Sequence, residues 1–418
     1  MSPLLDLVMS VVKSYPSIFA SPAVDLVYVI VLGLVAAQYS RVQSLEERVF
    51  GRPLNKAFNQ TVLSIGLGLL GGLAASVLLV LVGVTVSDSG VGYLLPVALV
   101  LFLFSPRFLC FSYAGGLISL SYLLLGWPKV NVAAIAALVA CLHAAESLLI
   151  WVSGESCATP LYLPDPKSEG GTVGGFSLQR FWPIPLIVLF LVKVPDISRL
   201  SGLITLPDWW PLIKAPDVAG IGTPVFQMMP IVAALGYGDL ALSRSPREKA
   251  RSTSRHLSVF SGILLGFAIA ASRWPAFNWI AALFGPIGHE VVIRVGNREE
   301  AERGARYVSS PDGVAVMGAF EGSPAATSGI GRGYVLVGCG GIPIRSRRDL
   351  EILLEEPGDV VLTVRPPGSS SAKEVVVRRN GAEPLGVILA PGLGDQPFAT
   401  TRTEGPLLHL LRRLLGKA

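Results

Sequence analysis

Long apolar runs dominate this chain and limit the folds that it can adopt. Of its 418 residues, 51% are hydrophobic and only 15% are charged, and the mean hydropathy is +0.58. Apolar runs close to the roughly 20 residues that a helix needs to cross a bilayer recur over residues 23–293. Soluble domains are seldom this apolar. The sequence therefore predicts a transmembrane helical domain over residues 23–293.

Nine candidate spans can be placed by hydropathy. They cover residues 23–39, 61–85, 91–105, 108–126, 131–152, 181–194, 221–242, 257–272 and 275–293. Only Ser105-Pro106-Arg107 separates the third run from the fourth, and the sixth is short, so we expect 8–9 spans. Residues 1–22 contain Lys13 and several prolines but no small-residue cleavage site. This favours an N-terminal interfacial helix over a removed signal.

Basic residues gather in two connectors and predict the orientation. The first set follows the first run and the second set follows the seventh: Arg41, Arg48, Arg52 and Lys56, then Arg244, Arg247, Lys249, Arg251 and Arg255. Under the positive-inside rule both connectors are cytoplasmic, and so is the C-terminal region. Arg199 and Lys214 count against this topology, since their connector lies on the other side. We expect a multi-pass protein of the plasma membrane.

Composition also argues against several classes of function. The 34 Lys and Arg against 29 Asp and Glu mostly flank apolar runs rather than forming a soluble basic patch, so no nucleic-acid partner is expected. Cys110, Cys141, Cys157 and Cys339 show no paired spacing, and two of them lie in apolar runs. Neither a disulfide framework nor a zinc site is predicted, and no cofactor is expected.

Two histidines within apolar runs invite a comparison with membrane proteases. The zinc type needs His-Glu-x-x-His on one helix, but neither His143 nor His289 has a second histidine four residues on. His143 and Glu146 share a helix face, and we expect a hydrogen-bonded pair that packs helices. Ser261 lacks both the upstream glycine of a rhomboid-like motif and a basic partner. The chain is therefore not expected to be an enzyme.

The sequence of the last quarter of the chain predicts a small α+β domain. Strands are predicted over 314–319, 334–339, 342–344, 359–365 and 373–379. Ser323 and Pro324 start a short helix that Gly329 ends. Gly340-Gly341 suits a two-residue hairpin turn. Ser346 and Asp349 form a capping box for a helix that continues to Glu356.

Residues 303–391 resemble the circularly permuted PDZ domain of bacteria. The resemblance rests on Gly-Ser-Pro-Ala-Ala, Gly-Tyr-Val-Leu, the hairpin, Arg-Asp-Leu and the late Pro384-Leu385-Gly386-Val387. Tyr334 departs from the pattern, because the family usually has an acid there. A PDZ domain binds chain ends or extended segments by adding them to its sheet as a strand. The resemblance thus implies an α-helical polytopic membrane bundle followed by a small α+β PDZ domain.

The same resemblance implies a peptide-binding site. In the permuted order, Leu385 and Gly386 form the loop that receives a terminal carboxylate, and Val387, Ile388 and Leu389 form the strand that receives the peptide. The helix 347–356, with Leu350, Leu353 and Leu354, forms the other wall. A second interpretation stays open, in which 385–389 is only a closing edge strand and the groove is blocked.

Over its whole length the chain resembles the MinJ family of polytopic PDZ proteins from the bacterial division-site selection machinery. The supporting stretches are His143-Ala-Ala-Glu-Ser-Leu-Leu-Ile, Gln179-Arg-Phe-Trp-Pro-Ile-Pro-Leu, Pro207-Asp-Trp-Trp-Pro-Leu and Arg306-Tyr-Val-Ser-Ser-Pro-Asp-Gly-Val. The resemblance implies a non-enzymatic adaptor between a DivIVA-like polar scaffold and a MinD-like ATPase. The alternatives are an intramembrane protease, or its regulatory subunit, and a transporter-like body under PDZ control.

Two further segments complete the expected organisation. Residues 294–306 are expected to form a charged linker between the membrane domain and the PDZ domain, 307–391. Residues 392–418 form a tail in which five leucines share one helix face opposite Arg412 and Arg413: Leu407, Leu408, Leu411, Leu414 and Leu415. A basic amphipathic helix of this kind lies on a lipid bilayer, docks on a partner or packs on its own domain.

Overall fold

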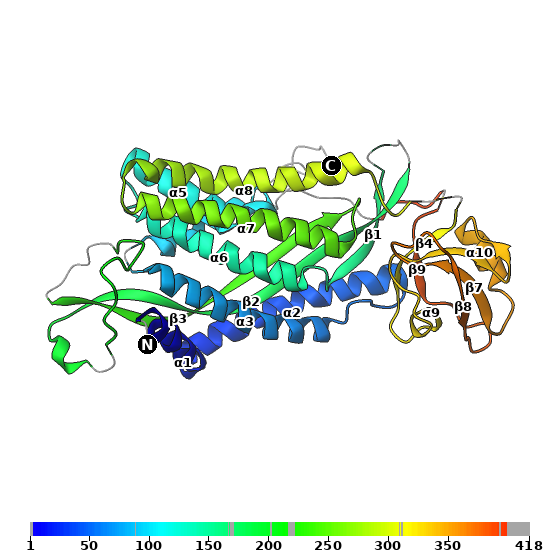
Figure 1. The fold of residues 1–418 in the computed structure, drawn as a ribbon, viewed down its shortest axis with the longest axis horizontal. Coiled ribbons are helices and arrows are strands. Elements are labelled where there is room, and N and C mark those ends of the chain that lie inside the picture. Colours follow the sequence, from blue (N-terminus) through cyan, green and yellow to red (C-terminus); the bar gives the residue numbers. More distant parts are fainter. Residues whose placement is uncertain are drawn as a thin grey trace.

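The computed structural model describes residues 3–87, 89–165, 167, 171–200, 203–215, 222–308, 310, 312–392 and 394–398. It has two parts (Figure 1). Residues 3–303 form an elongated helical body, and a long pair of strands runs through it. A smaller antiparallel sheet domain, residues 314–389, lies at one end of that body. The expected amphipathic helix of the tail falls on residues 399–418, outside the described residues.

Helices make up most of the body. They are α1 (Pro3–Ser14), α2 (Pro22–Phe50), α3 (Ala57–Val82), α4 (Leu94–Phe102), α5 (Phe111–Leu125), α6 (Val132–Ser153), α7 (Pro246–Ala271) and α8 (Ala276–Arg303). Among the described residues, five of them are long and apolar enough to cross a membrane: α2, α3, α6, α7 and α8. They indicate a membrane protein, but with fewer candidate spans than the 8–9 that hydropathy predicted.

The expected spans 181–194 and 221–242 are wrong, because both are strands. β2 (Thr172–Val194) and β3 (Thr223–Ala241) form a long antiparallel hairpin, and β1 (Ala158–Pro164) pairs with the first part of β2. Hydropathy alone does not separate a buried strand from a buried helix. The prolines within these runs break a helix, but a strand tolerates them wherever no ladder donor is needed.

The free edge of β2 shows how the prolines fit. Beyond β1, alternate residues of β2 turn their backbone toward the helices, and three N–H groups donate to side-chain hydroxyls: Phe181 to Tyr39 (3.1 Å), Ile187 to Ser76 (2.8 Å) and Leu191 to Ser87 (2.8 Å). Pro183 and Pro185 occupy the two positions of this row between Phe181 and Ile187, so no amide donor is left unpaired there. A buried sheet edge needs such partners, because a backbone polar group left unpaired away from water is costly.

Glycines of α3 let that helix approach the same edge. A Cβ added at Gly68 would overlap the carbonyl oxygen of Pro183, and one at Gly72 would overlap that of Pro185. The hydroxyl of Tyr15 donates to the Pro185 carbonyl at 2.9 Å. α3 therefore packs closely on β2, which is mostly buried, whereas much of β3 is exposed or half-buried.

The regions predicted as spans 91–105 and 108–126 contain two short helices that turn back within the body. α4 has nine residues and α5 fifteen, so each is shorter than the roughly 20 residues that a bilayer requires. α5 ends at the loop that leads into α6, and Asn131 N there donates to the carbonyl of Ser89, shortly before α4. At the turn between them, Cys110 lies beside His143, midway along α6.

The sheet domain matches the elements predicted for it. It contains β4 (Val314–Ala319), α9 (Pro324–Thr327), β5 (Val335–Cys339), β6 (Ile342–Pro343), α10 (Arg347–Leu353), β7 (Val360–Arg365), β8 (Lys373–Val377) and β9 (Val387–Leu389). The strand order is β8-β7-β5-β4-β9, with β6 paired to β5, and every pair is antiparallel. The capping box of Ser346 and Asp349 is present, although α10 ends earlier than Glu356.

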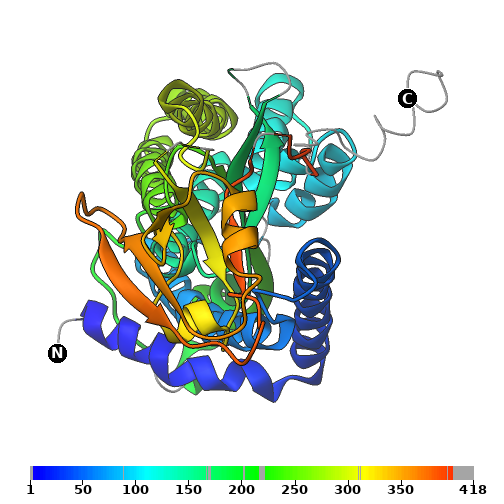
Figure 2. The same cartoon turned by 90° about the vertical axis from the view of Figure 1, so that its right-hand side faces the viewer.

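The sheet domain sits directly on the body. α8 continues as helix to Arg303, through most of the expected charged linker 294–306. Lys56, in the α2–α3 connector, pairs with Glu321 at 2.7 Å, and Gly174 N donates to the Tyr307 carbonyl at 2.7 Å. The basic connectors and the sheet domain thus share one end of the molecule (Figures 1 and 2). Lys214 lies at the other end, where its backbone N–H donates to Ser272.

Candidate functional site

The loop before β9 is fixed by the start of α9. Gly386 has φ +71°, and a Cβ there would overlap the side chain of Ser323. The carbonyl of Leu385 accepts from Ala325 N at 3.1 Å, and that of Gly386 accepts from Phe320 N at 2.9 Å. Glycine is required at 386 for two reasons, a left-handed backbone and a close approach.

Most of the expected peptide-binding residues lie in one apolar cluster. Leu350, Leu385 and Leu389 are buried in the core of the sheet domain, and Leu353, Leu354 and Val387 pack against it partly buried. Ile388 does not join them, because its side chain belongs to the core of the helical body. Alternation along a strand explains this division, since successive side chains point to opposite faces.

The outer edge of β9 is partly covered by the body. β9 ends the strand order, with β4 on one side only. On the other side, the hydroxyl of Tyr162 in β1 donates to the carbonyl of Leu389 at 2.8 Å. Phe398 N in turn donates to the carbonyl of Tyr162 at 3.2 Å. One acceptor that an added peptide strand needs is thus already occupied within the chain.

A small pocket adjoins the carboxyl end of β9. It lies between the start of α10 and the segment that follows β9, and its lining includes Val308, Val314, Ala315, Ser346, Arg347 and Ala390. Arg347 is half exposed and pairs with Glu351 at 3.0 Å. The pocket lies at the end of β9 opposite Gly386.

A second polar cluster lies inside the helical body. His143 Nδ1 lies 2.8 Å from Glu146 Oε2, so the expected hydrogen-bonded pair is present. Two further side chains lie beside the same ring, which the sequence did not predict. Cys110 Sγ lies 3.2 Å from His143 Nε2, and the His289 ring lies 5.2 Å from the His143 ring between centroids. Cys110 Sγ is also 3.6 Å from His289 Nε2. The three residues are far apart in the chain, and only the turn between α4 and α5 brings Cys110 to the histidines.

The serine considered for catalysis lies in an ordinary helical setting. Ser261 is buried and donates its hydroxyl to the carbonyl of Leu257 in its own helix at 2.7 Å. Polar side chains of membrane helices commonly satisfy themselves in this way.

Comparisons with known proteins add no assignment. No protein-family model matches the chain, and a search of curated proteins finds no match.

Proposed function

We propose that this protein is a non-enzymatic membrane scaffold that recruits partner proteins through a PDZ-type domain, residues 307–391. The observation that supports this most is the Leu385–Gly386 loop leading into the edge strand β9, with Leu350 of α10 in the same buried cluster as Leu385 and Leu389. That succession follows the circularly permuted PDZ order. An extended segment of a partner adds to β9 as a further strand, and backbone N–H groups near Gly386 receive a terminal carboxylate.

The proposed setting is bacterial division-site placement in the plasma membrane. By resemblance to the MinJ family, the partners are a DivIVA-like polar scaffold and a MinD-like ATPase. The clustering of the basic connectors and the sheet domain at one end supports a cytoplasmic position for that domain. The bilayer surrounds the helical body.

Strand addition at β9 is tested by site-specific photo-crosslinking in living cells. A photoreactive amino acid replaces Val387 on β9, and in a matched control it replaces Val376, an exposed valine on β8 at the opposite edge of the sheet. We expect partner adducts from position 387 and none from position 376. Adducts of equal yield from both edges, or none from position 387, would contradict the proposal.

The orientation is tested by cysteine labelling. Glu321→Cys marks the sheet domain, and Trp274→Cys marks the α7–α8 turn at the other end of the body. A membrane-impermeant maleimide should label the Trp274→Cys protein in intact cells and the Glu321→Cys protein only after permeabilisation. The reverse pattern would place the sheet domain outside.

A further inference from the structure

The cluster of Cys110, His143 and His289 has the composition and geometry of a metal site. The ligand atoms of the three side chains lie within 4.8 Å of one another. A tetrahedral Zn²⁺ ion, with Zn–S of about 2.3 Å and Zn–N of about 2.0 Å, separates sulfur from nitrogen by about 3.5 Å. The two sulfur–nitrogen distances, 3.2 Å and 3.6 Å, bracket that value.

The surroundings of His143 fit a metal ligand. Its Nδ1 faces the Glu146 carboxylate at 2.8 Å while its Nε2 faces Cys110. A carboxylate on the far nitrogen orients a ligating imidazole and raises its basicity. His289 Nδ1 is buried and has no such partner among the described residues, so only one of the two histidines has this support.

Two carboxylates lie near the cluster, Glu146 and Glu290. His143 lies midway along α6 and His289 midway along α8, where an uncompensated charge is costly. Glu146 contacts His143 at 2.8 Å, and among the described residues it has no ion pair with Lys or Arg. The neighbouring Glu290 is already compensated, since it pairs with Arg107 at 3.4 Å and Arg294 at 3.0 Å.

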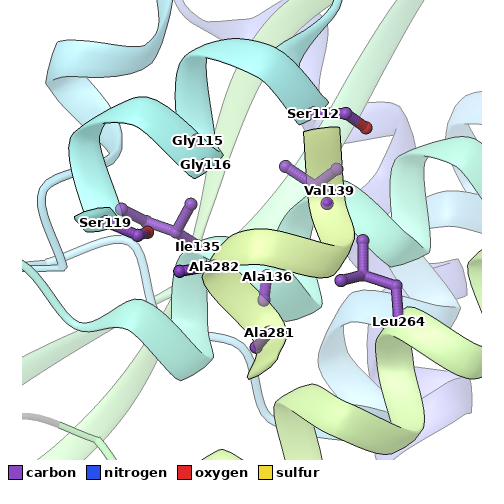
Figure 3. Close-up of a pocket in the computed structure, with 11 residues that line it drawn as sticks. Ser112, Gly115, Gly116, Ser119, Ile135, Ala136, Val139, Leu264, Ala281 and Ala282 are labelled. Atoms are coloured by element: carbon purple, nitrogen blue, oxygen red, sulfur yellow. The ribbon is translucent and has the colours of Figure 1, made fainter. Parts of the chain in front are cut away.

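A position for a fourth ligand lies next to the cluster. Ser112 Oγ lies 2.8 Å from His143 Nε2, and Ser112 also lines a cavity inside the body. Figure 3 shows that cavity, walled by small residues of α5 and α8, by α6 and by Leu264 of α7. Cys110, His143 and His289 are not among the residues that line the cavity, and Ser112 connects it to the cluster through its contact with His143.

We infer that Cys110, His143 and His289 bind a transition-metal ion of the Zn²⁺ class and so tie α5, α6 and α8 together. Thiolate and imidazole ligands suit Zn²⁺ and its neighbours rather than Mg²⁺ or Ca²⁺. Binding displaces the thiol proton of Cys110 to solvent and involves no redox change. The site is separate from β9, so partner capture does not depend on it.

The test uses the full-length protein in detergent, freed of metal by a chelator and then titrated with Co²⁺ or Zn²⁺. We expect one metal per chain to survive desalting, with a thiolate-to-Co²⁺ charge-transfer band and tetrahedral ligand-field bands. Cys110→Ser should abolish the charge-transfer band. Cys141→Ser, a buried cysteine in the same helix as His143, is the matched control and should leave the spectrum unchanged.

Two more measurements separate ligation from a folding defect. Glu146→Gln should weaken Zn²⁺ binding by about 10–100-fold while keeping the charge-transfer band, because it acts on His143 and not on the ion. In the unaltered chain, Zn²⁺ should slow alkylation of Cys110 by a membrane-permeant maleimide, measured by mass spectrometry. Equal alkylation with and without Zn²⁺, or no metal retained by the unaltered protein, would overturn the inference and leave a hydrogen-bonded cluster only.

Discussion

The hydroxyl of Tyr162 donates to the carbonyl of Leu389 at 2.8 Å, which joins the helical body to the edge strand of the sheet domain. Tyr162 is buried and its ring packs against Phe398 with a centroid distance of 5.1 Å. In the proposed function, a partner strand competes with this hydroxyl for one backbone acceptor of β9. We therefore expect this contact to limit how tightly the edge binds a partner.

Removal of that hydroxyl should strengthen partner binding. One hydrogen bond contributes about 1 kcal/mol net, so Tyr162→Phe should raise the affinity of the full-length protein for its partner roughly fivefold. The dissociation constant for the partner, measured on the detergent-solubilised protein, checks this. The matched control is Tyr334→Phe. Tyr334 immediately precedes β5, and β4 lies between β5 and β9 in the sheet. Equal effects of the two variants would show that Tyr162 does not restrain the edge.

Two glycines with similar backbones should respond differently to alanine. Gly386 (φ +71°) and Gly322 (φ +75°) both adopt the left-handed region, which costs a Cβ-bearing residue about 1–2 kcal/mol. Only at Gly386 does the new Cβ also overlap Ser323, whereas Gly322 has open space. Gly386→Ala should therefore destabilise the sheet domain more and abolish partner capture. A midpoint of thermal unfolding that falls equally in both variants would refute the close approach at Ser323.

The packing of α3 on β2 predicts a sharp contrast within one helix. Gly72→Ala should destabilise the body, because its Cβ would overlap the Pro185 carbonyl. Gly66→Ala is the control in the same helix, where nothing lies within 4 Å of the added atom. It should be neutral or stabilise by up to about 1 kcal/mol through helix propensity. Thermal unfolding in detergent measures both, and similar behaviour would argue against the strand pair beside α3.

The capping box of α10 should make part of the sheet domain's stability depend on pH. The backbone N–H of Arg345 and the Ser346 side chain hold the pKa of Asp349 below its usual value. A depressed pKa stabilises the fold above the unfolded value, about 3.9, and this contribution is lost as pH falls through the folded value. Asp349→Asn should therefore flatten the acid limb of the unfolding curve.

The reciprocal half of the box gives the control. Ser346→Ala removes the hydroxyl that accepts from Asp349 N at 3.1 Å and should cost about 1 kcal/mol. It should lower stability at neutral pH as well as at acid pH. An acid limb for Asp349→Asn that matches the unaltered protein would show that this carboxylate does not titrate as described.

The elements of the sheet domain were predictable from local sequence signals. Ser323-Pro324, Gly340-Gly341 and the Ser346–Asp349 box each act within four residues, so their effect on the backbone is visible in the chain itself. The same is true of the glycine at 386, whose pattern with its apolar neighbours predicts a loop leading into a strand.

Hydropathy predicted the secondary structure of the helical body only in part. It identifies apolar segments, but an apolar segment can form a strand or a helix, and the predicted spans 181–194 and 221–242 are strands in the structure. Pro183, Pro185 and Pro230 were the local signal against a helix. The length of α4 and α5 likewise depends on the turn at Cys110, which apolar composition does not reveal.

A membrane protein with an α+β domain in the last quarter of the chain was predictable from the residues alone, because apolar content, caps and turns are local properties of the chain. The folded chain was needed to show that Cys110 meets His143 and His289, and that Tyr162 covers the carbonyl of Leu389. Both are contacts between residues distant in the chain, and they arise from how helices and strands pack, which no spacing in the sequence encodes.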